Sequence, residues 1–175
     1  MNVSPHLWIA SNAQVILGDV QFLSKAADLL AKRMHKTNVQ VVVTAEAKSI
    51  ALAYALSKAL GHDRFVVARK NLKAYMNDHL SQKVRSITTT SEQELILTKE
   101  DIDLIGGRRV CVLDDVVSTG ATLKALEALV RRSGATIGCR AALWKEGPWY
   151  KGRRLIYLDS LPVFVDRTSP LAKSQ

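Results

Sequence analysis

Short runs of β-branched residues alternate along this chain with segments whose apolar residues recur at helical spacing. We expect strands at 39–45, 64–69, 108–115 and 136–144, and helices at 19–36, 49–60 and 122–132. A helix between successive strands is typical of βαβ units, which build a mostly parallel sheet with helices on both faces. The order of elements therefore predicts an α/β fold.

The composition suits one globular domain. The chain has 175 residues, of which 47% are hydrophobic and 23% charged, and these values exclude wholesale disorder. No apolar run is long enough to span a membrane, and the first residues do not form a basic segment followed by an apolar one, so neither an anchor nor a secretory signal is expected. Cys111 and Cys139 are too few for a disulfide framework, so we expect packing roles and a reducing, cytoplasmic compartment.

Residues 70–92 are the least regular part of the chain. They are polar and show no helix period, which predicts a functional loop or lid. We expect a hairpin made from residues 84–88 and 93–97 within and after this segment. Two shorter strands are expected near the C-terminus, at 154–158 and 161–165.

The most informative string is VCVLDDVVSTGATL, residues 110–123. An apolar strand ends in the carboxylates of Asp114 and Asp115, and a turn rich in hydroxyl groups around Gly120 then opens a helix. Free N–H groups at a helix N-terminus, with a glycine that permits close approach, suit a phosphate. Carboxylates repel phosphate but accept hydrogen bonds from sugar hydroxyls. The string therefore predicts a site for a ribose 5-phosphate group, and it matches neither the P-loop nor the dinucleotide fingerprint.

Charged residues also follow the two preceding strands. In open parallel sheets ligands bind at the carboxyl ends of strands, where these residues would meet the Asp pair. Lys48, Arg69 and Lys70 are candidates for holding anionic groups, and Glu46 for facing a hydroxyl or a metal. Each basic residue taken alone could equally be a solvated charge.

The string at 110–123 resembles the phosphoribosyl pyrophosphate (PRPP) motif of type I phosphoribosyltransferases. VVVTAEAKSIALAYALSKALG at 41–61 is similar to the strand, pyrophosphate loop and helix of the purine-salvage members, and VVARK at 66–70 to their next strand. The resemblance implies a type I phosphoribosyltransferase-like (Rossmann-like) α/β fold with a small hood subdomain and a flexible lid. It implies one domain over 1–175, with a core at about 37–145 and a hood from the N-terminal segment and about 154–167.

The resemblance also implies a role for each motif residue. The expected catalytic residues are Asp114, Asp115 and Lys48, the two acids holding the ribose hydroxyls. The 5-phosphate would be held by Ser118, Thr119, Gly120, Ala121 and Thr122. The pyrophosphate would lie against Ala45, Glu46, Ala47, Lys48, Arg69 and Lys70, with a cis peptide bond near Glu46–Ala47. The 6-position of a purine base would be contacted by Lys145 or Glu146.

The implied reaction transfers the 5-phosphoribosyl group from PRPP to a purine base, adenine- or xanthine-like, and releases pyrophosphate. Its product is a nucleoside monophosphate in purine salvage. Mg²⁺ is the expected cofactor, held mainly through substrate and water, with Asp114 and Asp115 as candidate ligands. The resemblance further implies a homodimer and a cytoplasmic enzyme.

Departures from the family pattern keep an alternative open. Thr89 stands where adenine enzymes carry a lid glutamate, and Lys48-Ser49 stands where they usually have Arg-Gly. Residues 11–23 lack the N-terminal segments of the adenine enzymes, so the identity of the base stays open. The alternative function is a PRPP-binding regulatory or catalytically inactive protein that senses nucleotide metabolism.

The formal net charge of +9 is concentrated in two blocks. Residues 64–85 contain six Lys or Arg and one Asp, as a site for a polyanion such as PRPP would require. Residues 131–154 contain seven Lys or Arg and one Glu, which the proposed chemistry does not need. A nucleic-acid partner is not expected from the motifs, because no helix-turn-helix pattern is visible, but this second block keeps it as an alternative to a solvated face.

Overall fold

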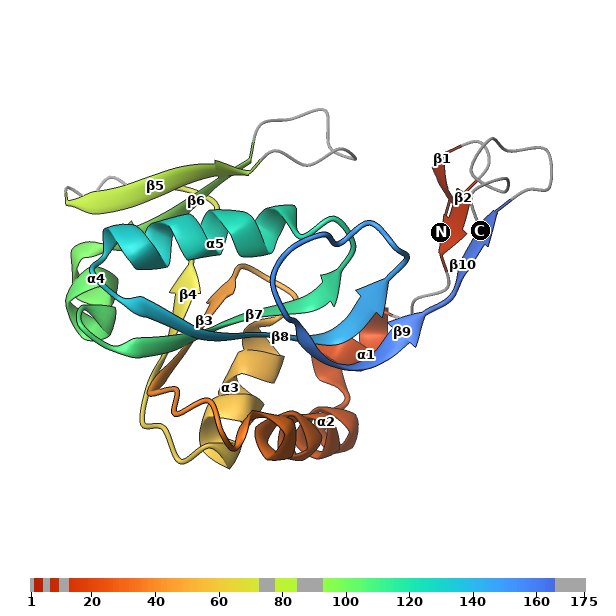
Figure 1. Ribbon diagram of the computed structural model, residues 1–175, viewed down its shortest axis with the longest axis horizontal. Coiled ribbons are helices and arrows are strands. Elements are labelled where there is room, and N and C mark those ends of the chain that lie inside the picture. The colour runs from red at the N-terminus through yellow and green to blue at the C-terminus, as the bar shows by residue number, and fades with distance from the viewer. Residues whose placement is uncertain (1, 5–6, 10–12, 73–77, 85–92, 166–175) are drawn as a thin grey trace.

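The computed structural model describes residues 2–4, 7–9, 13–72, 78–84 and 93–165, and its centre is a five-stranded sheet (Figure 1). Every neighbouring pair of strands in this sheet is parallel, and the strand order is β4-β3-β7-β8-β9. The strands are β3 (Val41–Ala45), β4 (Phe65–Ala68), β7 (Arg109–Val117), β8 (Thr136–Glu146) and β9 (Ile156–Leu161). The predicted mostly parallel α/β sheet is confirmed.

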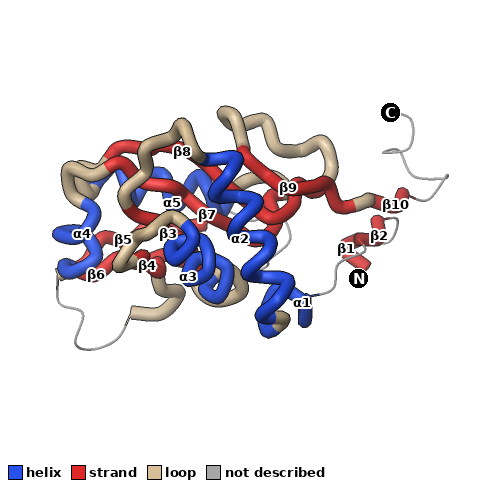
Figure 2. The backbone as a smooth tube through the Cα atoms, turned by 90° about the horizontal axis from the view of Figure 1, so that it is seen from below, coloured by secondary structure: helices blue, strands red, loops and turns tan. Residues whose placement is uncertain are grey.

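Helices cover both faces of the sheet. Two of them, α2 (Val20–Met34) and α3 (Ile50–Ala59), pack on one face, and α5 (Ala121–Arg132) packs on the other (Figures 1 and 2). α2 begins as predicted, because the Asp19 side chain accepts a hydrogen bond from the Phe22 backbone N–H at 2.9 Å. α3 ends before Gly61, whose φ of +72° is the left-handed conformation typical of a residue after a helix.

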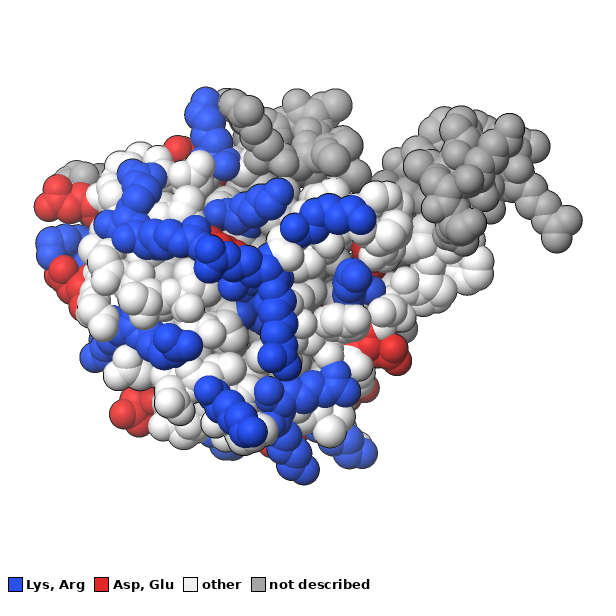
Figure 3. Space-filling model, in the orientation of Figure 1, with Lys and Arg blue, Asp and Glu red and all other residues white. Residues whose placement is uncertain are grey.

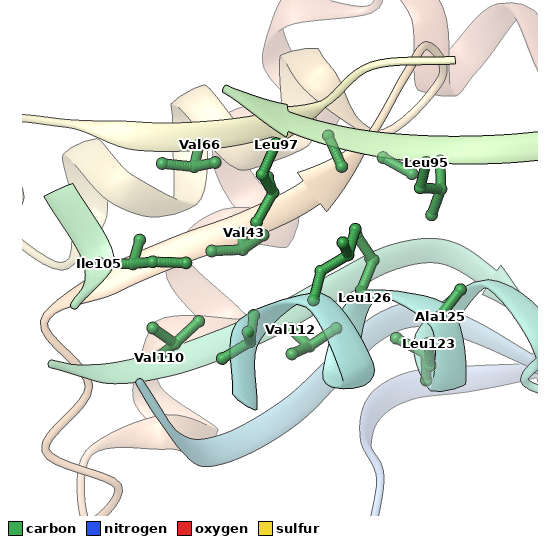
Figure 4. Packing of buried hydrophobic residues seen from close by; sticks show 14 of the residues in the cluster. Val43, Val66, Leu95, Leu97, Ile105, Val110, Val112, Leu123, Ala125 and Leu126 are labelled. Atoms are coloured by element: carbon green, nitrogen blue, oxygen red, sulfur yellow. The ribbon is translucent and has the colours of Figure 1, made fainter. Parts of the chain in front are cut away.

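Alternate residues of the strands pack toward opposite faces. The side chains toward α5 include Val41, Val43, Val110 and Val112, several of which appear in Figure 4. Those toward α2 and α3 include Val42, Cys111, Leu113 and Cys139. Because both faces are covered, the strands read as continuous apolar runs. The two cysteines are free and buried in the neighbouring strands β7 and β8, which agrees with the expected packing role.

A separate antiparallel hairpin lies over the α5 side of the sheet. It consists of β5 (His79–Val84) and β6 (Gln93–Thr98), so the predicted pairing partner of 93–97 begins earlier than expected, at His79, and residues 85–88 of the predicted strand lie outside the described residues. β5 was missed because its sequence, HLSQKV, is polar and takes its order from pairing with β6 rather than from an apolar pattern. Residues 73–77 and 85–92 of the predicted lid lie outside the described residues.

The short helix α4 (Lys99–Ile105) was not predicted. It begins with a capping box, in which Thr98 and Asp101 each accept a hydrogen bond from the other's backbone N–H. The helix α1 (Ala13–Gly18) was also not predicted. No helix in the described part of the chain is long and apolar enough to cross a membrane.

The two ends of the chain form a small sheet beyond β9 (Figure 1). Its antiparallel strands, in the order β1-β2-β10, are β1 (Asn2–Ser4), β2 (Leu7–Ile9) and β10 (Val163–Val165). The predicted strand at 161–165 is thus shortened to β10, because β9 continues to Leu161. These are the segments predicted to build a hood, and that role stays a prediction.

Candidate functional site

The candidate site lies at the carboxyl ends of the neighbouring strands β3, β4 and β7. Ala45 pairs with Ala68, and Thr44 pairs with Leu113, so β3 and β4 finish together at one end of the sheet and β7 continues past them to Val117. The Thr44 hydroxyl, fully buried, donates to the Leu113 carbonyl at 2.9 Å and fixes β3 against β7. The segments that the sequence predicted to converge are therefore neighbours.

Asp114 and Asp115 lie near the end of β7 and are half-buried. The buried Ser49 hydroxyl, at the start of α3, lies 3.3 Å from Oδ1 of Asp114 and 3.3 Å from Oδ1 of Asp115. The Asp115 backbone N–H also donates to Oδ1 of Asp114 at 3.0 Å. Ser49 was not selected from the sequence, although its place directly after the 45–48 loop is a usable signal.

The Asp114 carboxyl is harder to ionise than a carboxyl in water. Burial, and then the charge of the neighbouring Asp115, raise the pKa of Asp114 well above its usual value of 3.8. No cationic side chain in the described part of the chain forms an ion pair with either group. Oxygen atoms of Asp114 and Asp115 therefore remain able to accept hydrogen bonds from a ligand.

The 45–48 loop connects β3 to α3. Its Glu46–Ala47 peptide bond is cis, as the family resemblance implies. Glu46 accepts a hydrogen bond from the Lys70 backbone N–H at 3.0 Å and donates its own N–H to the Ala68 carbonyl at 3.0 Å. Ala47 and Lys48 are exposed.

The residues after β4 are held by the hairpin. Arg69 exchanges two backbone hydrogen bonds with Ile96 of β6, each 2.8 Å long. The side chains of Arg69 and Lys70 are exposed. Both cations thus stand beside the 45–48 loop and are free to meet an anion.

The turn between β7 and α5 contains Gly120, which precedes the first residue of the helix. Its φ of +79° is left-handed, and it is buried. The other predicted phosphate ligands, Ser118, Thr119, Ala121 and Thr122, are half-buried around it. A cavity of about 730 Å³ lies between this turn, the first residues of α5 and the β5–β6 hairpin, and it is lined by Ser81, Gln82, Lys83, Glu94, Thr119, Ala121, Lys124 and Ala125.

Tyr150, from the segment after β8, lies directly on Gly120. A Cβ atom at position 120 would be only 2.6 Å from Cδ2 of the Tyr150 ring. The Tyr150 hydroxyl donates to the Arg153 carbonyl at 2.8 Å, and a Cβ at Gly152 would also meet the ring, at 2.5 Å. Sequence reasoning missed Tyr150, although the flanking glycines at 147 and 152 indicate a tightly folded loop.

The two predicted base-contacting residues lie at the end of β8. Lys145 is half-buried and pairs with Val117, directly before the Gly120 turn, whereas Glu146 is buried and pairs with Leu161. Neither contacts Asp114 or Asp115 through an ion pair or hydrogen bond in the described part of the chain. Thr89, at the position of the lid glutamate, lies outside the described residues.

The donors available to a metal are the carboxylates just named. Among the residues that the structure describes, no three His, Cys, Asp or Glu side chains come together as a ready metal site. Asp114, Asp115 and Glu46 are nevertheless the oxygen donors that Mg²⁺ prefers.

Comparison with known proteins gives a consistent result. Residues 16–169 match the family described as "Phosphoribosyl transferase domain". A solved structure, adenine phosphoribosyltransferase from Thermoanaerobacter pseudethanolicus, has a TM-score of 0.70 and 24% identity, covering 83% of this chain and 84% of that one. This likeness confirms the predicted fold.

The chain is similar to both a regulator and enzymes. The purine biosynthesis transcriptional activator PurR of Lactococcus lactis is 28% identical over 141 residues, which are 81% of this chain and 50% of that protein. The chain thus spans about half the length of PurR. Adenine phosphoribosyltransferase of Thermosipho africanus is 31% identical over 70% of this chain and 68% of its own length. Xanthine phosphoribosyltransferase of Bacillus mycoides is 30% identical over 74% and 71%.

Proposed function

This chain belongs to the phosphoribosyltransferase family, and we propose that it transfers the 5-phosphoribosyl group from PRPP to a purine base with release of pyrophosphate. One observation carries the proposal. Asp114 and Asp115 share the Ser49 hydroxyl at the edge of the sheet, one short turn before the left-handed Gly120 and the N-terminus of α5. A pair of hydroxyl acceptors next to a phosphate-binding turn suits the two polar parts of ribose 5-phosphate.

In this proposal the 5-phosphate binds to the backbone and hydroxyl groups of residues 118–122. The ribose hydroxyls donate to Asp114 and Asp115, and Ser49 keeps the two carboxylates oriented. The pyrophosphate lies against the loop of Ala45, Glu46, Ala47 and Lys48, with Arg69 and Lys70 beside it. Support comes from the exposed cations next to that loop and from the hydrogen bond between Glu46 and the Lys70 N–H.

The reaction breaks the bond between C1 of the ribose and the pyrophosphate oxygen and forms a bond from C1 to a nitrogen of the base. Positive charge develops on the ribose and negative charge on the departing pyrophosphate. The carboxylates stand on the ribose side and Lys48, Arg69 and Lys70 on the pyrophosphate side, so each charge meets the opposite sign. Preorganised electrostatics is therefore the main catalytic contribution.

Mg²⁺ is the proposed cofactor. Because no three carboxylates come together among the described residues, the ion would be held largely by the phosphates of its substrate, with Asp114 and Asp115 as candidate ligands. When bound, it would neutralise charge on the pyrophosphate oxygens and so improve the leaving group.

The base is proposed to be a purine bound next to the end of β8. Lys145 is placed one strand away from the phosphate turn and is the candidate contact for the 6-position, with Glu146 as the second candidate. The small sheet of β1, β2 and β10 would act as the hood of a single domain. The proposal is completed by a homodimeric state and a cytoplasmic location. Light scattering of the purified protein tests the homodimeric state.

Release of pyrophosphate tests the proposal directly. Adenine, hypoxanthine, guanine, xanthine and orotate are offered in parallel with PRPP and Mg²⁺, and we expect turnover with at least one purine and none with orotate. Asp115→Asn is expected to weaken PRPP binding without unfolding the protein, while Asp28→Asn, an exposed carboxylate on α2, is the matched control. Equal PRPP affinity in both variants contradicts the assignment of the ribose site.

A second candidate function is regulation through PRPP binding. The observation that favours it is the similarity to PurR, whose name describes a transcriptional activator, over 81% of this chain. Binding of PRPP, detected as a rise in Tm at saturating ligand, combined with no pyrophosphate release from any base, would select this candidate.

A further inference from the structure

Between residues 116 and 155, every exposed charged side chain is positive. This stretch is fully described, and its two acids, Glu127 and Glu146, are buried. The exposed cations are Lys124, Arg131, Arg132, Lys151, Arg153 and Arg154, which we name the α5 basic face. Figure 3 shows Lys and Arg spread across the middle of this side of the molecule and on down to its lower edge, with most acidic atoms toward the edges.

The structure brings these cations together. Lys124 and Arg131 are seven residues apart, so they lie on one side of α5, separated by about 10 Å along its axis. Arg132 is the last residue of the same helix, and the loop that carries Lys151, Arg153 and Arg154 lies against the start of this helix, because Tyr150 packs on Gly120. The cations of α5 and those of the loop after β8 thus belong to one surface.

Two of the cations are held in place by hydrogen bonds to other parts of the protein. The Arg131 guanidinium is bonded to the buried Glu127 carboxylate at 2.6 Å, and that of Arg132 donates to the Ser81 carbonyl at 2.6 Å. The side chains of Lys124, Lys151, Arg153 and Arg154 have no hydrogen bond or ion pair with another described residue. They are available to an external anion.

The proposed phosphoribosyl transfer does not rely on this face, although Lys124 also lines the cavity beside the Gly120 turn. Its anion-binding side chains are Lys48, Arg69 and Lys70, at the ends of β3 and β4. We propose that the α5 basic face binds the phosphate backbone of a double-helical nucleic acid, independently of base sequence. This inference goes beyond the proposed function and does not depend on it.

The composition of the face selects the duplex over other polyanions. Single strands are bound by stacking unpaired bases on aromatic rings, but Trp149 and Tyr150 are half-buried and packed against Gly147 and Gly120. No large apolar side chain of residues 116–155 is exposed, so the face offers nothing to insert into a lipid layer or to bury against a protein. Cations alone fit regularly spaced phosphates.

Binding is measured by fluorescence anisotropy with labelled duplexes of about 20 base pairs, one of DNA and one of RNA, at increasing salt. The duplexes carry 5′-hydroxyl ends, so that no terminal phosphate can occupy the Gly120 turn. If all six cations contact phosphates, affinity falls about 10³-fold between about 50 and about 200 mM salt. The two duplexes identify which double helix is preferred.

Two charge-reversal variants separate this face from the overall charge. Lys151→Glu/Arg153→Glu/Arg154→Glu is expected to lower the log–log salt slope by about 3 and to weaken binding roughly tenfold or more. Lys25→Glu/Lys32→Glu/Lys58→Glu changes the net charge equally on α2 and α3, at exposed positions on the other side of the sheet, and is expected to bind nearly as well as the wild type. Circular dichroism confirms that both variants are folded.

The proposal is overturned by equal losses in the two variants, by tighter binding of a single strand than of either duplex, or by no binding at about 50 mM salt. The nucleic-acid proposal does not depend on phosphoribosyl transfer. Asp115→Asn, which should weaken PRPP binding, is expected to bind the duplex like the wild type. Conversely, the triple variant at 151, 153 and 154 is expected to retain PRPP binding.

Discussion

Asp114 and Glu127 belong to the same strand–turn–helix unit, yet their surroundings are opposite. Glu127, on α5, accepts two hydrogen bonds from the buried Arg140 of β8, one of them 2.8 Å long, and another from Arg131. Among the residues that the structure describes, Asp114, on β7, forms hydrogen bonds only with Ser49 and Asp115. One carboxylate is fully neutralised, and the other faces a like charge.

The pKa values follow these surroundings. Burial opposes ionisation of Glu127, but hydrogen bonds from Arg140 and then Arg131 hold its pKa below the usual value of 4.5. Burial and the Asp115 charge raise the pKa of Asp114. A carboxyl left without a counter-ion at a strand end costs stability, and such groups gather at functional sites. The difference separates a residue that stabilises the fold from one that we propose binds the ribose.

Removing the paired carboxylate should have the largest effect on stability. We expect Glu127→Ala to lower the free energy of unfolding by about 3–5 kcal/mol, because Arg140 would remain buried without its partner. Asp103→Ala is the control, since Asp103 pairs with Lys99 at the surface of α4 and the loss there should be about 0.5 kcal/mol or less. Urea unfolding of the two variants measures the difference, and similar losses would contradict the structural role of Glu127.

The next effect concerns the turn between these two carboxylates. Gly120→Ala is expected to cost about 1–3 kcal/mol and to weaken PRPP binding, because the new methyl group meets both a left-handed φ and the Tyr150 ring. Gly134→Ala is matched in φ, at +76°, but has nothing within 4 Å of the added carbon, so it reports the backbone cost alone. Tyr150→Ala in the Gly120→Ala background should restore part of the loss. Equal costs at the two glycines would show that Tyr150 is not in contact.

Neutralising the unpaired carboxylate should act in the opposite direction. We expect Asp114→Asn to raise Tm by about 2–4 °C for each 1 kcal/mol of relieved repulsion, while PRPP binding is lost. Because the folded pKa is raised, the wild type loses stability as pH rises from about 3.9 through that folded pKa, so the gain should be larger at pH 8 than at pH 4. Calorimetry at both pH values measures it, with Asp28→Asn as the control. A destabilised Asp114→Asn protein would mean that Asp114 has a structural partner after all.

The smallest expected effect concerns the loss of stability at acidic pH. Glu127 has a lowered folded pKa, so its contribution is present above the unfolded value near 4.5 and is lost as pH falls through the folded pKa. Glu127→Gln should therefore show a shallower loss of stability below about pH 4.5 than the wild type. Urea unfolding at several acidic pH values measures the free energy of unfolding. If it falls equally steeply with pH in both proteins, Glu127 does not contribute to the acid sensitivity.

The sequence predicted the elements whose signals are local. The helix of α2 follows from its apolar spacing and the Asp19 cap, and the strand of β7 from an apolar run before two acids. The edge of the sheet where the motifs meet was also predicted, because parallel strands carry their ends to one side. β5 and α4 were missed, since β5 is polar and ordered by its pairing with β6, and α4 is a helix of only seven residues that depends on the capping box of Thr98 and Asp101.

By itself, the sequence determined the parallel α/β fold and the identity of the strand-end motifs, because hydrophobic period and turn chemistry act between neighbours in the chain. Only the tertiary structure decided that Ser49 joins Asp114 across 65 residues, that Tyr150 lies on Gly120, and that Arg140 neutralises Glu127. These contacts depend on which strands and loops become neighbours in space. The physical reason is that a side chain's charge, burial and partners are properties of the packed sheet and helices, and no local pattern records them.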